Sequence, residues 1–430
     1  MGLQQARQST PENMVSRLVI HYRFTLIILG LLLWLIPATA ADWPQFLGVN
    51  RNGSTSGESL VPAFPGSEPE IIWSHELGSG FAGPVVSGDQ VFIFHRKANQ
   101  AVLESLSTQN GKVKWTFKYV TDYKDDFGFD NGPRAVPLVH DKKIYLMGAE
   151  GFAHCIDSLT GKCIWSVNLH KQLESTKGFF GRACSPLIVR DNLILQVGGK
   201  QAGIVGLNTT TGTLKWKATD HEAGYASPIT ATIGGQEIAI CFTRHGLVCL
   251  NPTSGEVLIE NAHRSTMQAS VNAASPVMVS PNRVFLSACY GVGAAVWQLS
   301  PVDKSLNPIW ETNQKLDCHY ATPVNFDGHL IGFHGRQETG TKLRCIDALN
   351  GKIKWQSGRM AAGSVTLAGK TLVILTERGE LILAKASNKS FKPAARGQIL
   401  GADTRAMPAI SNGRLFARDK RKLVCVKLKP

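Results

Sequence analysis

One short stretch of this chain returns several times along the sequence. Residues 155–165 (CIDSLTGKCIW) alternate apolar and polar side chains, pass through Thr-Gly-Lys and end on a tryptophan after a second short alternation. This pattern predicts a strand, a tight turn and a strand, because glycine takes the positive φ that such turns require. Similar hairpins occur at 106–115, 207–216 and 346–355, and weaker ones at 250–259 and 299–310. A repeated unit of this kind constrains the fold more than any other feature, since each copy buries its apolar face against the next.

A second recurring element precedes the hairpins. It begins with a small residue and proline, continues as an apolar strand and, after a turn, ends in another strand, as in AVPLVHDKKIYLM at 135–147. Eight copies occur, at 83–94, 135–147, 184–197, 226–242, 274–288, 321–333, 364–375 and 406–417. Consecutive marker positions are between 42 residues (Pro186 to Pro228) and 53 residues (Pro84 to Pro137) apart, with Val365 in place of proline in the seventh copy. Each period therefore holds four short strands, here A to D, which is typical of a β-propeller blade.

The two ends of the repeat array complement each other. The last copy has strands A (406–410), B (414–417) and C (423–428) and then ends without a D strand, whereas a spare strand of the D type stands at 70–77 (EIIWSHEL). The sequence thus predicts an all-β, eight-bladed β-propeller over 70–430 with four-stranded antiparallel blades, closed by an N-terminal strand that completes the last blade. Such closure removes exposed strand edges. Residues 41–69 are predicted to be an extended lead-in.

Residues 1–40 have the layout of a signal peptide. Arg7, Arg17 and Arg23 precede the apolar run 24–36 (FTLIILGLLLWLI), and Ala-Thr-Ala follows at 38–40. A basic region, a short apolar region and small residues predict export, with cleavage between Ala40 and Ala41. The protein is then expected in the periplasm or cell envelope. The alternative is an uncleaved segment that holds the protein at the membrane.

Charge and cysteines limit the partners further. The formal net charge is +14, and it becomes +12 without residues 1–40, which hold three arginines and one glutamate. A positive balance favours anionic partners such as cell-wall polymers, acidic glycans or lipid headgroups. The expected partner is an envelope protein or an anionic ligand or polymer. Nucleic acid is not expected, because no such motif is present and export argues against it. Four of the nine cysteines (Cys155, Cys249, Cys345 and Cys425) fall at one repeat position, which Ser105 and Gly206 fill in other copies. This shared position reads as a small buried packing site, whereas a disulfide between Cys241 and Cys249 stays open.

The topology of a blade separates two kinds of loop. The A–B and C–D turns lie on one face and are short and repetitive, and the D–A and B–C loops lie on the other face and carry most of the irregular polar residues. Residues just before each A strand are predicted to point toward the central channel: Phe81, Arg134, Arg182, Tyr225, Asn272, Tyr320 and Arg405. Loops on a rigid scaffold are where binding usually takes place. The arginines and tyrosines suit an anionic or planar ligand, and the alternative is that they cap blade edges and solvate the funnel.

From these loops we take Arg134, Arg182, Asn272, His319, Tyr320 and Arg336 as the candidate ligand-binding residues. No catalytic residue is identified, because no nucleophile stands in a Ser-His-Asp context. Asp125, Asp126 and Asp130 lack the spacing and glycine of a Ca²⁺ loop, so no metal site is predicted. Cys318-His319 lacks the first cysteine of a haem-attachment motif, since Lys315 stands there.

The Ser-Pro A strands, the Asp-x-x-Thr-Gly-Lys-x-x-Trp hairpins and the opening DWPQFLG at 42–48 together resemble the pyrroloquinoline-quinone (PQQ)-like repeat family of eight-bladed propellers, over about residues 42–430. One branch of that family comprises quinoprotein alcohol dehydrogenases, including those of the polyvinyl-alcohol dehydrogenase type. The other comprises non-enzymatic propellers of the BamB type, which help outer-membrane barrel assembly. The resemblance therefore implies either PQQ as a cofactor or a scaffold role without one.

The family's dehydrogenases use a vicinal Cys–Cys disulfide over the quinone, a stacking tryptophan below it, and a Glu/Asn/Asp Ca²⁺ site with an aspartate base. This chain has no Cys-Cys pair, and Trp73, Trp115, Trp165, Trp216, Trp310 and Trp355 belong to predicted D strands. The favoured hypothesis is a non-catalytic, BamB-like binding or scaffold protein of the envelope. The alternative is a PQQ-dependent oxidoreductase with the quinone in the funnel, held by arginine contacts to its carboxylates.

Overall fold

The computed structural model describes residues 1–2, 42–55 and 57–429. Residues 42–55 and 57–429 belong to one compact unit, which carries the fold. The predicted signal peptide lies outside the described residues apart from its first two. In the described part of the chain, no helix is long and apolar enough to cross a membrane.

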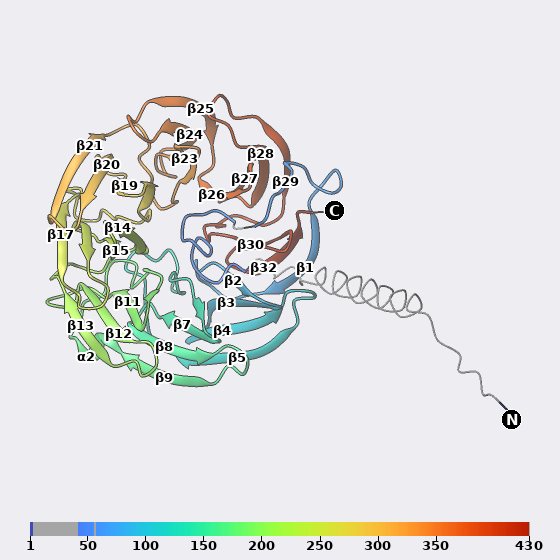
Figure 1. Cartoon of the computed structure of the whole chain (residues 1–430), viewed down its shortest axis with the longest axis horizontal. Coiled ribbons are helices and arrows are strands. Elements are labelled where there is room, and N and C mark those ends of the chain that lie inside the picture. Colours follow the sequence, from blue (N-terminus) through green and yellow to red (C-terminus); the bar gives the residue numbers. More distant parts are fainter. Residues whose placement is uncertain (3–41, 56, 430) are drawn as a thin grey trace. The chain divides into compact units, whose positions relative to one another are not determined.

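Residues 42–429 form eight antiparallel sheets of four strands each, arranged as a ring (Figure 1). Blade 1 holds β2 (Val85–Ser87), β3 (Gln90–Lys97), β4 (Gln100–Ser107) and β5 (Val113–Val120), and blade 2 holds β6 (Leu138–His140), β7 (Lys143–Met147), β8 (Phe152–Asp157) and β9 (Cys163–Asn168). Blade 3 holds β10 (Leu187–Val189), β11 (Asn192–Gln196), β12 (Ile204–Asn208) and β13 (Leu214–Ala218), and blade 4 holds β14 (Ile229–Ile233), β15 (Gln236–Phe242), β16 (Gly246–Leu250) and β17 (Val257–Ala262). A short helix, α2 (Leu169–Gln172), follows β9.

The second half of the ring repeats this plan. Blade 5 holds β18 (Val277–Ser280), β19 (Arg283–Ala288), β20 (Gly293–Ser300) and β21 (Ser305–Thr312), and blade 6 holds β22 (Val324–Phe326), β23 (His329–His334), β24 (Thr341–Asp347) and β25 (Ile353–Met360). Blade 7 holds β26 (Gly363–Ala368), β27 (Thr371–Thr376), β28 (Glu380–Lys385) and β29 (Pro393–Gln398). Blade 8 holds β30 (Ala409–Ser411), β31 (Arg414–Arg418), β32 (Lys422–Lys427) and β1 (Glu70–Glu76). The predicted all-β, eight-bladed propeller is confirmed.

The ring is closed by strands from opposite ends of the sequence. β1 pairs antiparallel with β32, from Glu70 opposite Lys427 to Glu76 opposite Lys422. Trp73 of β1 packs in the same apolar cluster as strands β31 and β32. Closure of this kind leaves β32 with a partner on both sides, as the sequence predicted.

The repeated tryptophan and the repeated glycine of neighbouring blades contact each other. A Cβ added to Gly161 of blade 2 would lie 2.5 Å from the Trp115 ring of blade 1, and the φ of Gly161 is +72°. The Trp115 indole also donates to the Ser158 carbonyl of the same turn (3.1 Å). Equivalent indole-to-carbonyl bonds of 2.7 to 3.2 Å are donated by Trp73, Trp165, Trp216, Trp310 and Trp355. Glycine is therefore required both by the backbone and by the ring that covers it.

The shared cysteine position lies on the C strand opposite that tryptophan. Cys155 pairs with Trp165, and Cys345 pairs with Trp355, in the register of their blades. All four cysteines at this position are fully buried, and all nine cysteines are free thiols in the structure. In blade 3 the position is Gly206, where a Cβ would lie 2.2 Å from Trp216. A small side chain is needed because the indole lies across it, which accounts for the exchange of Cys, Ser and Gly.

The first part of the lead-in lies inside the ring and pairs with blades 1 and 7 (Figure 1). Trp43 forms a bridge with Val86 of β2, and Ser54 forms one with Leu367 of β26. Between them, the guanidinium of Arg51 donates to the carbonyls of Pro186 (2.9 Å) and Pro228 (2.8 Å), at the innermost strands of blades 3 and 4. Burial lowers the pKa of Arg51 to about 10. Residues 42–55, which we call the plug, thus join blades from both halves of the ring.

Deletion of residues 70–77 is expected to abolish cooperative unfolding of the ring, because β32 would lose its outer partner and blade 8 its tryptophan. Differential scanning calorimetry of chain 41–430 with and without this strand measures the effect. Two broad transitions or no transition are expected for the deletion. Unchanged single-transition melting of the truncated chain would contradict the closure argument.

Arg51→Met is expected to lower the free energy of unfolding by roughly 1–3 kcal/mol. The methionine fills part of the same space, but the Pro186 and Pro228 carbonyls lose their donor. Urea denaturation followed by circular dichroism gives the value, with the exposed Arg421→Met as the matched control. An equally negligible change in the free energy of unfolding of both variants would show that the Arg51 contacts do not stabilise the propeller.

Candidate functional site

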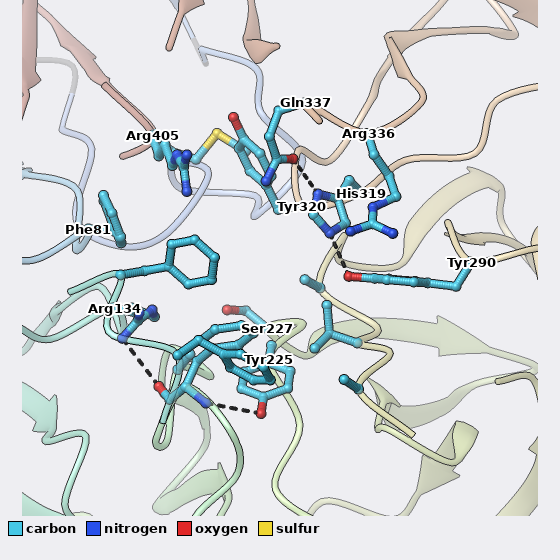
Figure 2. A pocket seen from close by; sticks show the side chains of 18 of the residues that line it. Phe81, Arg134, Tyr225, Ser227, Tyr290, His319, Tyr320, Arg336, Gln337 and Arg405 are labelled. Atoms are coloured by element: carbon cyan, nitrogen blue, oxygen red, sulfur yellow. Dashed lines mark hydrogen bonds between the residues drawn. The ribbon is translucent and has the colours of Figure 1, made fainter. Parts of the chain in front are cut away.

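A cavity of about 400 Å³ opens on the face of the ring formed by the D–A and B–C loops. Its lining comes from many separate loops, and Figure 2 shows the labelled side chains pointing toward a common space. Four of the six candidate residues line it: Arg134, His319, Tyr320 and Arg336. Phe81, Tyr225 and Arg405, which also precede A strands, line it as well. Phe46 of the plug belongs to the lining too, so the plug helps to bound the cavity.

Arg182 and Asn272 are not among the residues that line the cavity. Both side chains are buried and form hydrogen bonds with backbone carbonyls. Arg182 is 1% exposed, and it donates to the carbonyls of Val197 (3.2 Å) and Glu150 (3.0 Å) and to Ser175 Oγ (2.5 Å). Burial lowers the pKa of Arg182 to about 10. Their place in the candidate site came from position alone, and position before an A strand does not distinguish a ligand contact from a loop anchor.

Asn272 anchors its loop in the same manner. Its Nδ2 donates to the carbonyls of Thr243 (2.9 Å) and His263 (3.0 Å), and the residue is 3% exposed. The side chain thereby ties the D–A loop before blade 5 to the B–C loop of blade 4. Both residues position the loops of the cavity without facing it.

Each arginine of the cavity already has a carboxylate partner. Arg134 donates to Asp125 (2.7 Å), whose side chain is fully buried. Arg336 lies 3.2 Å from a Glu338 carboxylate oxygen. Arg405 has its closest carboxylate oxygen, from Glu377, at 3.6 Å. The positive charge that the sequence placed at this opening is therefore balanced locally.

The arginines also lie over aromatic rings. The Arg134 guanidinium is 5.5 Å from the centre of the Phe81 ring and 5.2 Å from that of Phe180. Arg336 lies 4.5 Å over the Tyr290 ring. Such contacts hold both the cation and the ring in place. The walls of the cavity are consequently fixed before any ligand arrives.

His319 is the centre of a hydrogen-bonded chain along one wall. Tyr290 Oη donates to Nε2 of His319 (2.7 Å), and Nδ1 of His319 lies 2.5 Å from Gln337 Oε1 (Figure 2). Because a glutamine oxygen can only accept, Nδ1 carries a proton, and in the neutral imidazole Nε2 then accepts from Tyr290. Burial is the main cause that lowers the pKa of His319, and burial raises the pKa of Tyr290 to about 12. This row of hydrogen bonds orients Tyr290, and none of its three side chains is an activated nucleophile.

Two wall residues, Tyr320 and Arg405, have a buried polar atom without a hydrogen-bond partner among the described residues. In Tyr320 this atom is the hydroxyl oxygen, and in Arg405 it is Nε. Burial, and then the nearby Glu377 carboxylate, raises the pKa of Tyr320. Its contribution to the cavity is therefore mainly the ring, with the hydroxyl held in its neutral form.

The acidic loop 122–131 has a structural role. Asp125 pairs with Arg134, Asp126 pairs with Lys177, and Asp130 accepts from the Gly132 amide (2.6 Å). Within residues 42–55 and 57–429, no group of three or more His, Cys, Asp or Glu residues is placed to hold a metal ion. Asp125 and Asp130 are thus occupied by loop contacts.

The cavity does not fit the quinone-binding pattern that the family resemblance implies. No two cysteines are adjacent in the sequence, and Cys318 is buried with its sulfur near the Leu316 carbonyl. No tryptophan is among the described residues that line the cavity, where Phe and Tyr rings stand instead. The cavity arginines are engaged by carboxylates of this chain. The cysteine pair, the tryptophan and the metal-binding carboxylate set of that pattern are not found among the described residues that line the cavity.

The aromatic character of the site was missed by the sequence analysis. Phe127 and Phe129 are 49% and 51% exposed at the mouth, and both contact Phe180, with ring centres 5.4 and 6.1 Å apart. Met267 is 52% exposed and also lines the cavity. A signal for this was present in the sequence, because two D–A loops contain several phenylalanines, whereas exposed loops usually consist of polar and turn-forming residues.

These features define an eight-bladed propeller of PQQ-like repeats with an aromatic cavity on its D–A and B–C face. A family model described as outer membrane protein assembly factor BamB matches residues 101–316, which is half of the chain, so the chain belongs to this family of PQQ-like repeat propellers.

The relatives include an enzyme of the same fold. The quinoprotein alcohol dehydrogenase PedH of Pseudomonas putida is 26% identical over 211 residues, which cover 44% of this chain and 34% of PedH. The chain thus matches about a third of the length of that curated relative.

Two solved structures share the fold. BamB from Moraxella catarrhalis superposes with a TM-score of 0.61 at 14% identity, covering 84% of this chain and 98% of that one. The quinohemoprotein alcohol dehydrogenase from Comamonas testosteroni gives 0.60 at 14% identity, covering 90% and 80%. At this identity the likeness concerns the fold alone. BamB and the quinohemoprotein alcohol dehydrogenase are thus about equally similar to this chain in backbone.

His334→Asn is expected to flatten the loss of stability of the propeller below pH 6.5. His334 ends β23 beneath the Arg336 loop, and its Nδ1 accepts from the Asp317 amide (3.0 Å). Burial, and then the charges of Arg344 and Lys342, lower its pKa to about 4. The unfolded chain takes up this proton first, so stability falls by roughly 1–3 kcal/mol as pH drops from about 6.5 toward 4.

An asparagine oxygen can accept from Asp317 at any of these pH values. Urea denaturation between pH 7 and pH 4 compares the native chain, His334→Asn and a control, His140→Asn, at an exposed histidine. A pH profile unchanged by His334→Asn would exclude His334 as the source.

Proposed function

We propose that this chain is an exported, non-catalytic binding or scaffold protein of the cell envelope. One observation carries the proposal: the cavity offers aromatic rings and arginines already paired with carboxylates, in place of a cysteine pair, a stacking tryptophan and a metal-binding carboxylate set. Binding then takes place at the D–A and B–C face, with Arg134, His319, Tyr320 and Arg336 around the opening. The family match to an outer membrane protein assembly factor supports the envelope assignment.

Export is the part of the proposal that rests on sequence. Residues 1–40 read as a signal peptide, and a chain of this family would act in the periplasm or at the envelope. The positive balance of the remaining chain favours an envelope protein or an anionic polymer as a partner at the outer surface.

A second candidate is a PQQ-dependent oxidoreductase that acts on alcohols or polyvinyl alcohol. The similarity to PedH favours it. In it, the carboxylates of a planar cofactor would share the three arginines with Asp125, Glu338 and Glu377, which already balance their charge. The geometry of the cavity supports the non-catalytic proposal better.

Titration with PQQ separates the two candidates. Purified chain 41–430 is titrated with PQQ, with and without Ca²⁺, by isothermal calorimetry, and alcohol-dependent dye reduction is assayed on the same sample. We expect neither stoichiometric binding nor turnover, because the quinone-holding side chains are missing. A PQQ-dependent alcohol dehydrogenase treated in parallel is the positive control. Stoichiometric binding together with turnover would overturn the proposed function.

A further inference from the structure

The walls of the cavity are mostly carbon. Aromatic rings reach it from separate elements of the ring: Phe46 from the plug, Phe81 before blade 1, Phe180 before blade 3, Tyr225 before blade 4 and Tyr290 from blade 5. Between them lie small apolar side chains of the loop before blade 5. Rings arranged around a space of this size favour an occupant that is itself a ring, because aromatic pairs prefer edge-to-face and offset contacts over contact with water.

The charges at the cavity argue for an uncharged occupant. Every lining arginine has a carboxylate of this chain within 3.6 Å, so its positive charge is already balanced and an anion gains less beside it than beside an unpaired cation. The Glu338 carboxylate also lines the cavity and would repel an anion directly. A cation would meet three guanidinium groups. A neutral group avoids both costs.

Apart from the Tyr320 hydroxyl and Arg405 Nε, which have no hydrogen-bond partner among the described residues, several hydrogen-bonding groups of the wall are engaged. Tyr290, His319 and Gln337 bond to one another. The hydroxyls of Ser185 and Ser227 accept from the backbone amides of Val136 and Ser185. The cavity therefore selects by shape and apolar contact, and it offers few polar contacts to a sugar or another polyhydroxyl ligand.

The apolar surface continues out of the cavity. Phe127, Phe129 and Met267 form a lip of half-exposed side chains, which we call the aromatic lip. The ring of Phe127 contacts Phe180 inside and Phe179 outside, with centres 5.4 and 5.6 Å apart. A free small ring would occupy only part of the cavity and leave this lip in water. A side chain attached to a longer chain would cover both.

We propose that the cavity takes an uncharged aromatic side chain from the interior of an extended, uncharged peptide segment of a partner protein, with the neighbouring residues on the aromatic lip. This rests on the proposed function and names its partner by chemistry. The internal position follows from the resident carboxylates, since a terminal carboxylate beside Glu338 would be repelled. The contact buries one ring in a fixed pocket, which is the arrangement of a binding hot spot.

The test uses fluorescein-labelled peptides of Gly and Ser, acetylated and amidated, with one central Phe, Trp or Ala. Fluorescence anisotropy with chain 41–430 measures their affinities. The Phe and Trp peptides are expected to bind at least tenfold more tightly than the Ala peptide. A peptide that ends on Phe with a free carboxylate is expected to bind more weakly than its amidated form.

Two substitutions locate the binding. Ala269→Trp places a large ring at an exposed position of the lining and is expected to abolish binding of the Phe peptide. Phe127→Ser removes part of the aromatic lip and is expected to weaken binding roughly tenfold. Leu159→Ser, at a 62% exposed leucine in a C–D turn on the other face, is the matched control and should leave the affinity unchanged. Thermal melting of each variant checks that the propeller is folded.

The outcomes are distinct from those of the PQQ titration. Equal affinities of the Phe and Ala peptides, or binding that survives Ala269→Trp in a folded protein, would overturn the inference while the non-catalytic function stood. Binding of free indole as tight as that of the Trp peptide would show that the occupant is a small molecule, which also overturns it. Preference for the free-carboxylate peptide would contradict the internal position.

Discussion

The contact between the tryptophan of one blade and the turn glycine of the next is the constraint on which the ring depends. At Trp115 and Gly161 the indole lies where a Cβ would be, and its N–H binds the carbonyl of Ser158 in the same turn. One side chain thus fixes the distance and the rotation between two sheets. Equivalent bonds recur at five other junctions, so six of the eight junctions share this contact and set a similar angle between neighbouring blades.

This outer set of contacts leaves the inner loops free to vary. The junctions hold the blades together near the C–D face, so the D–A and B–C loops contribute little to the geometry of the ring. These loops can therefore present phenylalanine, arginine or histidine at the opposite face. The plug supplements the junctions from within: Arg51 binds carbonyls of blades 3 and 4, and Phe46 reaches the cavity. The cavity is consequently a product of three separate parts of the chain, namely a rigid ring, variable loops and an N-terminal segment.

Much of the fold could be predicted because its signals are local and repeated. The hairpin at 155–165, its copies and the missing strand of the last blade were sufficient for the number of blades and the closing pair of β1 and β32. Four of the six candidate residues line the cavity, since position before an A strand or in a B–C loop places a side chain near the axis. Arg182 and Asn272 do not line it, because the same position also suits a side chain that turns back to bind its own loop.

The sequence by itself determined the repeat, the pairing of its two ends and the face on which the loops differ. These follow from periodicity, turn chemistry and the small residue opposite each tryptophan, which are properties of neighbouring residues. Only the tertiary structure decided the character of the site. Whether an arginine is available to a ligand depends on which carboxylate lies beside it, and Asp125, Glu338 and Glu377 reach Arg134, Arg336 and Arg405 through folding. The pairing cancels the charge that the sequence alone placed at the opening and leaves a cavity of rings.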